Sequence, residues 1–313
     1  MDIKCVPLFN GSFNQTRYAY VTRGPENKMS VLIIDPMEEK IVKTTLFNSG
    51  KDFVAAIPQH FGGKQKIQVA LFEIFNYQNH GYDYVERFIQ SIRAACNQLR
   101  VAHYFIPLYE LGASSALVAA KNVDAKYGDS LFLVEVSDDE YQIGEFKYTK
   151  DGYKREGINS FDFVLKESPV VTLKNIMEFF EITELPQRII VYAYSPETKF
   201  DRIKAIFNPK PVTTISSKEI HAGRIKYICC IAPFILRKSP SLFVPMFNQN
   251  YFIPTLPEPY VVTALIGDNM FTVAEFEQCE DLPAEKNIVL SRSIDRCAVI
   301  IGRCTGNVFA ADI

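Results

Sequence analysis

The densest group of reactive side chains in this sequence is acidic: Glu135, Asp138, Asp139 and Glu140 fall within six residues. Carboxylate oxygens are the ligands that Mg²⁺ and Ca²⁺ prefer in proteins, so this group could hold a hard cation. The group also lies between two β-rich runs, where a solvated acidic hairpin turn has the same composition. We favour the acidic turn and keep the cation site as the alternative.

The other reactive residue types are scattered. The four histidines stand apart from one another, no Cys-x-x-Cys occurs among the seven cysteines, and no Gly-x-Ser-x-Gly, Walker or Gly-x-Gly-x-x-Gly motif is present. A small basic group at Lys147, Lys150, Lys154 and Arg155 is typical of surface charge. The sequence therefore predicts reduced, mostly buried thiols, no catalytic residue and no metal site.

Charge and hydropathy exclude several classes of partner. The chain has 34 Lys+Arg against 36 Asp+Glu, a formal charge of −2, which favours neither nucleic acid nor a membrane surface. Its longest apolar run, Ile228–Leu236, is far shorter than the roughly 20 residues that span a bilayer. With no secretory pattern at Met1–Lys4, we expect a cytoplasmic protein, with the nucleus as the alternative.

Hydrophobic periodicity divides the chain into three parts. The first two parts each alternate strands with helices, in the order β–β–α–β–α, and the last part shows only strands. The expected domains are residues 1–232, with lobes of about 1–125 and 126–232, and a β domain over 233–313. The expected strands are 18–22, 30–34, 67–75, 101–108, 131–136, 141–148, 188–194, 260–266, 271–278, 287–293, 297–303 and 308–313, and the expected helices are 52–60, 84–99, 113–121, 171–180, 199–207 and 217–231.

Read in order, these runs resemble the seventy-kilodalton heat-shock chaperones (heat shock protein 70). Ser130–Glu145 (SLFLVEVSDDEYQIGE) is similar, without gaps, to the family's second phosphate hairpin, NVLIFDLGGGTFDVSI. The further matching segments are Gln68–Asn76, Val101–Asp124, Ile189–Phe207, Lys218–Cys230, Asn248–Pro254 and Phe276–Arg303. Each match is short, but their shared order and the β-only tail make the combination specific.

The resemblance implies an α/β protein with a two-lobed actin-like ATPase (ribonuclease H-like) fold. The large insertions of the family are missing, since the span from Phe161 to Val171 leaves no room for its helical lobe. A small all-β domain follows and resembles a truncated peptide-binding domain. In the family, ATP and magnesium bind between the two lobes.

At the positions that the resemblance assigns to the nucleotide site, this chain departs from the family. The triple glycine becomes Ser137-Asp138-Asp139, and the threonine after it becomes Glu140. Glycine is needed there because phosphate lies against bare backbone N–H groups. Like charges about 4 Å apart also cost on the order of 4 kcal/mol at an effective dielectric near 20.

Three further departures lie outside this hairpin. The segment Phe9–Phe13 is similar to the first phosphate loop, and there Gly11 and Ser12 are kept while Phe9 replaces an aspartate. No glycine lies between Gly157 and Gly223, where the adenosine site would fall, and the acidic residue of the family's EPTAA motif falls on Ala113.

The degenerate cleft positions are thus Gly11, Ser12, Glu135, Ser137, Asp138, Asp139 and Glu140. We expect a pseudo-ATPase without cofactor or metal that acts as a binding or scaffold module for a protein or peptide. One alternative is a divergent molecular chaperone that still binds ATP with magnesium. The other is an α/β protein unrelated to the family. The oligomeric state stays open.

Overall fold

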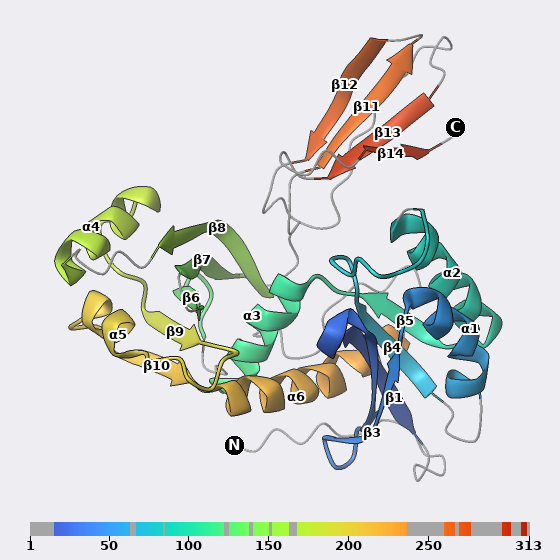
Figure 1. The fold of residues 1–313 in the computed structure, drawn as a ribbon. Helices are drawn as coiled ribbons and strands as arrows, with labels where there is room; N and C mark the ends of the chain where they lie inside the picture. Colours follow the sequence, from blue (N-terminus) through green and yellow to red (C-terminus); the bar gives the residue numbers. More distant parts are fainter. Residues whose placement is uncertain are drawn as a thin grey trace. The chain divides into compact units, whose positions relative to one another are not determined.

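The computed structural model describes residues 16–62, 67–83, 85–121, 125–137, 140–149, 152–162, 168–236, 260–266, 269–276, 296–301 and 308–311 (Figure 1). Close Cα packing divides the chain into two units. Unit 1 contains residues 1–122 and 216–248, and unit 2 contains residues 123–215 and 249–313. Residues 138–139, 237–259 and 287–293, on which several sequence predictions fall, lie outside the described residues.

Unit 1 is built on a five-stranded sheet in the order β3-β2-β1-β4-β5. Its strands are β1 (Arg17–Arg23), β2 (Met29–Asp35), β3 (Lys40–Phe47), β4 (Ile67–Glu73) and β5 (Ala102–Phe105). The first three strands form an antiparallel meander, whereas β1, β4 and β5 run parallel. The carboxyl ends of β1, β4 and β5 therefore share one edge of the sheet.

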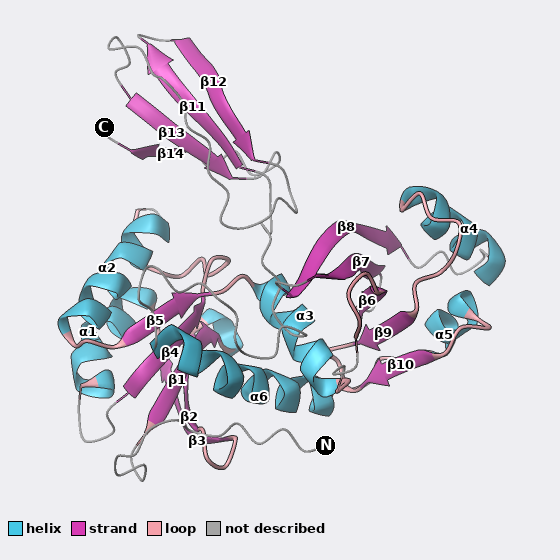
Figure 2. Ribbon diagram, turned by 180° about the vertical axis from the view of Figure 1, so that it is seen from behind, coloured by secondary structure: helices cyan, strands magenta, loops and turns pink. Residues whose placement is uncertain are grey.

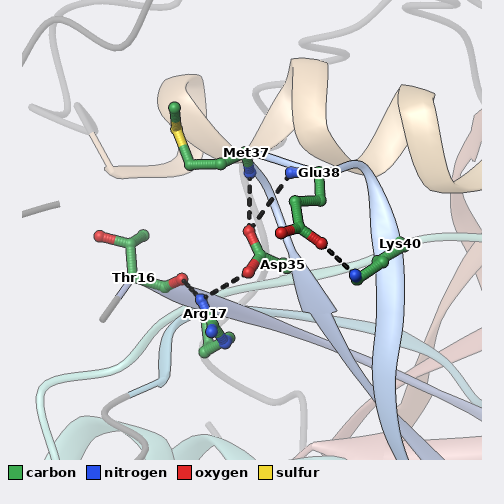
Figure 3. Close-up of polar contacts among 6 residues, drawn as sticks. All are labelled: Thr16, Arg17, Asp35, Met37, Glu38 and Lys40. Atoms are coloured by element: carbon green, nitrogen blue, oxygen red, sulfur yellow. Dashed lines mark hydrogen bonds and ion pairs between the residues drawn. The ribbon is translucent and has the colours of Figure 1, made fainter. Parts of the chain in front are cut away.

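The turn between β2 and β3 is fixed by the Asp35 carboxylate (Figure 3). One of its oxygens accepts the backbone N–H of Met37 at 2.9 Å and that of Glu38 at 3.4 Å. The other oxygen lies 3.1 Å from the Arg17 guanidinium on β1. An aspartate that binds the backbone two residues on is a strong turn former, so this local chemistry starts the third strand.

Four helices pack on this sheet: α1 (Gly50–Phe61), α2 (Val85–Gln98), α3 (Leu108–Ala119) and α6 (Ser217–Leu236). In Figure 2, α1 and α2 lie on one side of the sheet and α3 and α6 on the other. The α1/α2 side contains the main apolar core, with Val21, Phe53, Phe72 and Phe88. On the other side, α6 packs against α3 and against β1, β4 and β5.

Unit 2 repeats this arrangement. Its strands β6 (Ser130–Val136), β7 (Glu140–Thr149), β8 (Gly152–Asp162), β9 (Arg188–Tyr192) and β10 (Val212–Ile215) form a sheet in the order β10-β9-β6-β7-β8. Again a three-stranded meander continues into two parallel strands. Helices α4 (Pro169–Phe179) and α5 (Asp201–Phe207) pack on its apolar face, against Phe132 and Ile189. The shared strand order confirms the predicted pair of related α/β lobes.

The expected lobe pattern β–β–α–β–α is wrong in detail, because each lobe has the order β–β–β–α–β–α–β–α. The missed strands are β3, β8 and β10. All but two residues of β3 are exposed, and β8 carries a charged stretch over 154–156, so neither shows the alternation of a half-buried strand. Strand β10 has only 4 residues. Helix α3 also begins at Leu108, five residues before the predicted start at Ala113.

The C-terminal part contains a separate small antiparallel sheet in the order β12-β11-β13-β14. Its strands are β11 (Tyr260–Ile266), β12 (Asn269–Phe276), β13 (Arg296–Ile301) and β14 (Val308–Ala311). These agree with four of the five strands predicted from the sequence, and the fifth, 287–293, lies outside the described residues. The predicted boundary near residue 233 stays a prediction.

Helix α6 begins with a reciprocal capping arrangement. The Ser216 backbone N–H and hydroxyl both donate to the Glu219 carboxylate, at 2.8 and 2.6 Å, and the Glu219 N–H donates back to the Ser216 hydroxyl at 3.4 Å. These hydrogen bonds lower the pKa of Glu219. The arrangement satisfies backbone donors that have no partner within the helix.

We expect Ser216→Ala to destabilise the protein by about 1 kcal/mol, because the cap of its longest described helix is lost. Urea denaturation would measure this change. Ser217→Ala is the matched control, since Ser217 is the first residue inside the helix and alanine suits that position. Equal losses in the two variants would contradict the role of the cap.

Candidate functional site

At the carboxyl edge of the unit 1 sheet, a carboxylate and a hydroxyl meet side by side. Thr22 near the end of β1 is the register partner of Glu73 at the end of β4, and the Thr22 hydroxyl donates to the Glu73 carboxylate. Glu73 is only 8% exposed. Burial raises the pKa of Glu73, and the Thr22 hydrogen bond and the Arg224 charge oppose this effect only in part.

Tyr20 and Arg224 complete this group, which we call the unit 1 edge cluster (Tyr20, Thr22, Glu73 and Arg224). The Arg224 guanidinium, from α6, lies over the Tyr20 ring with 5.9 Å between its central carbon and the ring centroid. Tyr20 is 4% exposed, and burial raises the pKa of its hydroxyl. Tyr20 and Thr22 are two residues apart on β1, so both side chains lie on the face that α6 covers.

A second buried polar group lies where β5, α3 and α6 pack together. Glu110 in the first turn of α3 is 7% exposed, and its charge is the main cause of the raised pKa of Tyr104 on β5. On α6, burial and then Glu110 raise the pKa of Tyr227, whereas Ser114 lowers it. Four oxygen-bearing side chains thus gather inside unit 1.

At the corresponding edge of the unit 2 sheet, a carboxylate and a hydroxyl again meet, but the two groups have changed places between the strands. Glu135 near the end of β6 is the register partner of Tyr192 at the end of β9, and the Tyr192 hydroxyl donates to the Glu135 carboxylate at 2.9 Å. Strands β6 and β9 correspond to β1 and β4 in the shared strand order. In both units, therefore, the carboxylate at this edge accepts a hydroxyl from the adjacent parallel strand.

The predicted acidic segment does form the β6–β7 hairpin. Ser137 and Glu140 close its turn: the Ser137 N–H and hydroxyl donate to the Glu140 carbonyl at 2.9 and 3.0 Å, and the Glu140 N–H donates to the Ser137 hydroxyl at 3.3 Å. Asp138 and Asp139, between them, lie outside the described residues. The structure thus brings Ser137 together with Glu140, and Glu135 with Tyr192.

Gly11 and Ser12, predicted as remnants of the first phosphate loop, also lie outside the described residues. Within the described part, the first hairpin joins β1 to β2, and its turn carries the one-turn helix Pro25–Asn27. The Gly24 N–H donates to the Lys28 carbonyl at 2.7 Å across this turn. A five-residue turn containing proline thus occupies the first hairpin of unit 1.

Sequence reasoning missed the unit 1 edge cluster and Glu110. Thr22 and Glu73 are 51 residues apart and meet only through parallel pairing, for which no local motif exists. Glu110 was missed because the helix was expected to start at Ala113. Pro107, the N-cap of α3, is the signal that could have placed this start, since proline is common at helix N-termini.

No group of three or more His, Cys, Asp or Glu side chains with the geometry of a metal site occurs among the described residues. None of the described helices is long and apolar enough to cross a membrane.

The two five-stranded sheets, which share one strand order, agree with the α/β fold class that the sequence predicted. Solved structures similar to this chain include the following three. The first is a protein of unknown function with an actin-like ATPase fold from Bacteroides thetaiotaomicron, with 12% identity, 67% of this chain and 95% of that chain covered, and a TM-score of 0.32.

The second is an inorganic polyphosphate/ATP-glucomannokinase from Arthrobacter, with 10% identity, 67% and 97% of the two chains covered, and a TM-score of 0.34. The third is the Aquifex aeolicus PPX-GPPA enzyme, with 12% identity, 72% and 94% covered, and a TM-score of 0.32. No protein-family model and no curated protein matches the chain. Values this low carry no information about activity, so the fold assignment rests on the strand order within each sheet.

Proposed function

We propose that this chain is a non-hydrolysing protein of the actin-like ATPase fold, resembling the seventy-kilodalton heat-shock chaperones, that acts as a binding or scaffold module for a protein or peptide. The observation that carries the proposal is that each edge carboxylate already accepts a hydroxyl from its own sheet. Thr22 donates to Glu73, and Tyr192 donates to Glu135.

Both edge carboxylates are poorly placed for catalysis. A carboxylate that activates water or holds magnesium must present lone pairs to that ligand. One lone pair of each carboxylate already accepts a hydroxyl. The remaining lone pairs are hard to reach, because Glu73 is buried under α6 and Glu135 is half-buried against Tyr192. This restricted access disfavours metal binding at both edges.

The β6–β7 hairpin supports the same proposal. A phosphate-binding hairpin offers bare backbone N–H groups to the ligand. Here the N–H groups of Ser137 and Glu140 already donate within the turn, to the Glu140 carbonyl and the Ser137 hydroxyl. Two aspartates follow Ser137 in the sequence, and their charge would repel a polyphosphate.

The binding partner is assigned to the C-terminal sheet because of the resemblance to a shortened peptide-binding domain. Its four antiparallel strands follow the two α/β lobes in the chain, as in that family. An extended peptide with apolar side chains is the ligand that such a β domain would take. Because the lobes are proposed to bind no nucleotide, the affinity for the peptide would not depend on ATP.

The test uses the full chain with two probes. Isothermal titration with Mg-ATP is expected to give no binding heat up to about 1 mM nucleotide, while a fluorescent extended apolar peptide binds with the same anisotropy curve with and without ATP. A thermal shift scan is the cross-check, because a ligand at about 100 times its Kd stabilises a protein by about 2.7 kcal/mol.

The specific alternative is a divergent chaperone that keeps ATP with magnesium, and it is favoured by the retained strand order of both lobes. Micromolar Mg-ATP binding with a nucleotide-dependent peptide affinity would establish this alternative and end the pseudo-ATPase proposal. Absence of peptide binding together with absence of ATP binding would overturn the assignment of the β domain.

A further inference from the structure

The unit 1 edge cluster lies where open α/β sheets usually bind their ligands. In such sheets, ligands bind beyond the carboxyl ends of the parallel strands. Thr22 and Glu73 mark the carboxyl ends of β1 and β4. A buried carboxylate at this edge attracts a cation, and an aromatic face beside it favours a flat one.

In this chain, a side chain supplies that cation. The Arg224 guanidinium lies over the Tyr20 ring, and its charge lowers the pKa of both Tyr20 and Glu73 against the effect of burial. The pKa of Tyr20 is also affected by Glu73 and Thr22, and the pKa of Glu73 is also affected by Thr22. Arg224 thus brings a positive charge to this edge, with its guanidinium over the Tyr20 ring.

The backbone of α6 is held so that Arg224 must point to this place. Gly223 packs so tightly on α3 that an added Cβ would lie 2.4 Å from the Ser115 carbonyl oxygen. Arg224 follows directly and is half-buried as a residue, and the Nε of its guanidinium is buried. Shortening the arginine would therefore leave a space of guanidinium shape beside the Tyr20 ring, which a small cation could fill.

We propose that the carboxyl edge of unit 1 is a binding site for a guanidinium cation, and that α6 fills this site with its own Arg224. The carboxylate of Glu73 provides the charge, and the ring of Tyr20 provides the flat surface. The internal occupant keeps the site closed to external cations of the same shape. This inference does not depend on the proposed function, because it concerns a guanidinium and neither ATP nor a peptide.

The test is chemical rescue in the full chain. Arg224→Ala is expected to lower the Tm by about 3–6 °C, and about 50 mM methylguanidinium is expected to restore at least half of that loss. The wild type, whose site is filled, should show no rise. Methylammonium should rescue less than methylguanidinium, because it lacks the planar group that stacks on a ring.

Arg93→Ala is the matched control. Arg93 on α2 is an exposed arginine whose guanidinium carbon lies 5.1 Å from the centroid of the Phe105 ring, on β5 of the same sheet. Within the described part of the chain, it forms no ion pair with a carboxylate. Equal rescue of Arg93→Ala, or no rescue of Arg224→Ala, would overturn the inference. If Arg224→Ala does not fold, Arg224→Lys takes its place, since its ammonium keeps the charge without the planar fork.

The double variant Arg224→Ala with Glu73→Gln separates the site from a general solvent effect. Without the carboxylate, methylguanidinium is expected to give no rescue. Rescue that persists in this double variant would contradict the assignment of Glu73 as the anionic group. Neither outcome bears on ATP or peptide binding, so failure here and failure of the proposed function are distinguishable.

Discussion

Gly223→Ala is expected to destabilise the protein by about 2 kcal/mol, although glycine-to-alanine changes inside helices normally stabilise by about 1 kcal/mol. The added Cβ would lie 2.4 Å from the Ser115 carbonyl oxygen and 3.0 Å from the Ala119 Cβ, both on α3. The carbonyl belongs to the backbone, so relief requires that the two helices move apart. Most of α3 is fully buried, which leaves little room for such a movement.

Thermal unfolding would measure this effect, since about 2 kcal/mol corresponds to a Tm lower by roughly 4–8 °C for a domain of this size. The matched control is Ala222→Gly at the preceding, exposed position of the same helix. It should cost no more than about 1 kcal/mol through helix propensity alone. A Gly223→Ala variant as stable as the wild type, or more so, would contradict the close packing of α3 on α6.

The parts of the fold with a strong local pattern could be predicted from the sequence. The apolar spacing in α2 and the alternation in β6 and β7 gave the right element types with boundaries within two residues. The third strand of each meander could not be predicted, because β3 is an outer strand with little burial and the charged stretch over 154–156 interrupts the alternation in β8. Pairing with β2 and β7 makes them strands, and that pairing has no local signature.

The residues of the candidate site also fall into a group that could be predicted from the sequence and a group that could not. Glu135, Ser137 and Glu140 were found because they lie in one continuous hairpin whose sequence could be compared directly. Glu73 and Arg224 were not assigned to it, since each meets its partner through sheet register or helix packing. Tyr192 was expected to crowd the nucleoside, but its contact with Glu135 was missed because it depends on sheet register. The resemblance also placed the acidic position of the EPTAA motif on Ala113, which lies inside α3, whereas Glu110 in the first turn is the buried carboxylate.

Removing the hydroxyl that binds Glu73 is expected to have the second large effect. Thr22→Val keeps the shape of the side chain but leaves a buried carboxylate without its strand donor, at a cost of about 1–3 kcal/mol near pH 8. Urea denaturation between pH 4 and pH 8 would measure it. Thr44→Val is the matched control, since Thr44 is an exposed threonine in β3 of the same sheet, and its replacement should be nearly neutral.

The effect of Thr22→Val must depend on pH in one direction. The pKa of Glu73 is raised in the folded state above its ordinary value of 4.5, so Glu73 destabilises the fold progressively as pH rises from that value through the folded pKa. The Thr22 hydrogen bond lowers this pKa, and its loss raises the pKa further. Thr22→Val should therefore destabilise little below pH 4.5 and most at pH 8.

In a Glu73→Gln background, the cost of Thr22→Val should no longer change with pH, because the group that titrates is gone. A pH-dependent cost that survives in that background would show that another group, and not Glu73, receives the Thr22 hydroxyl.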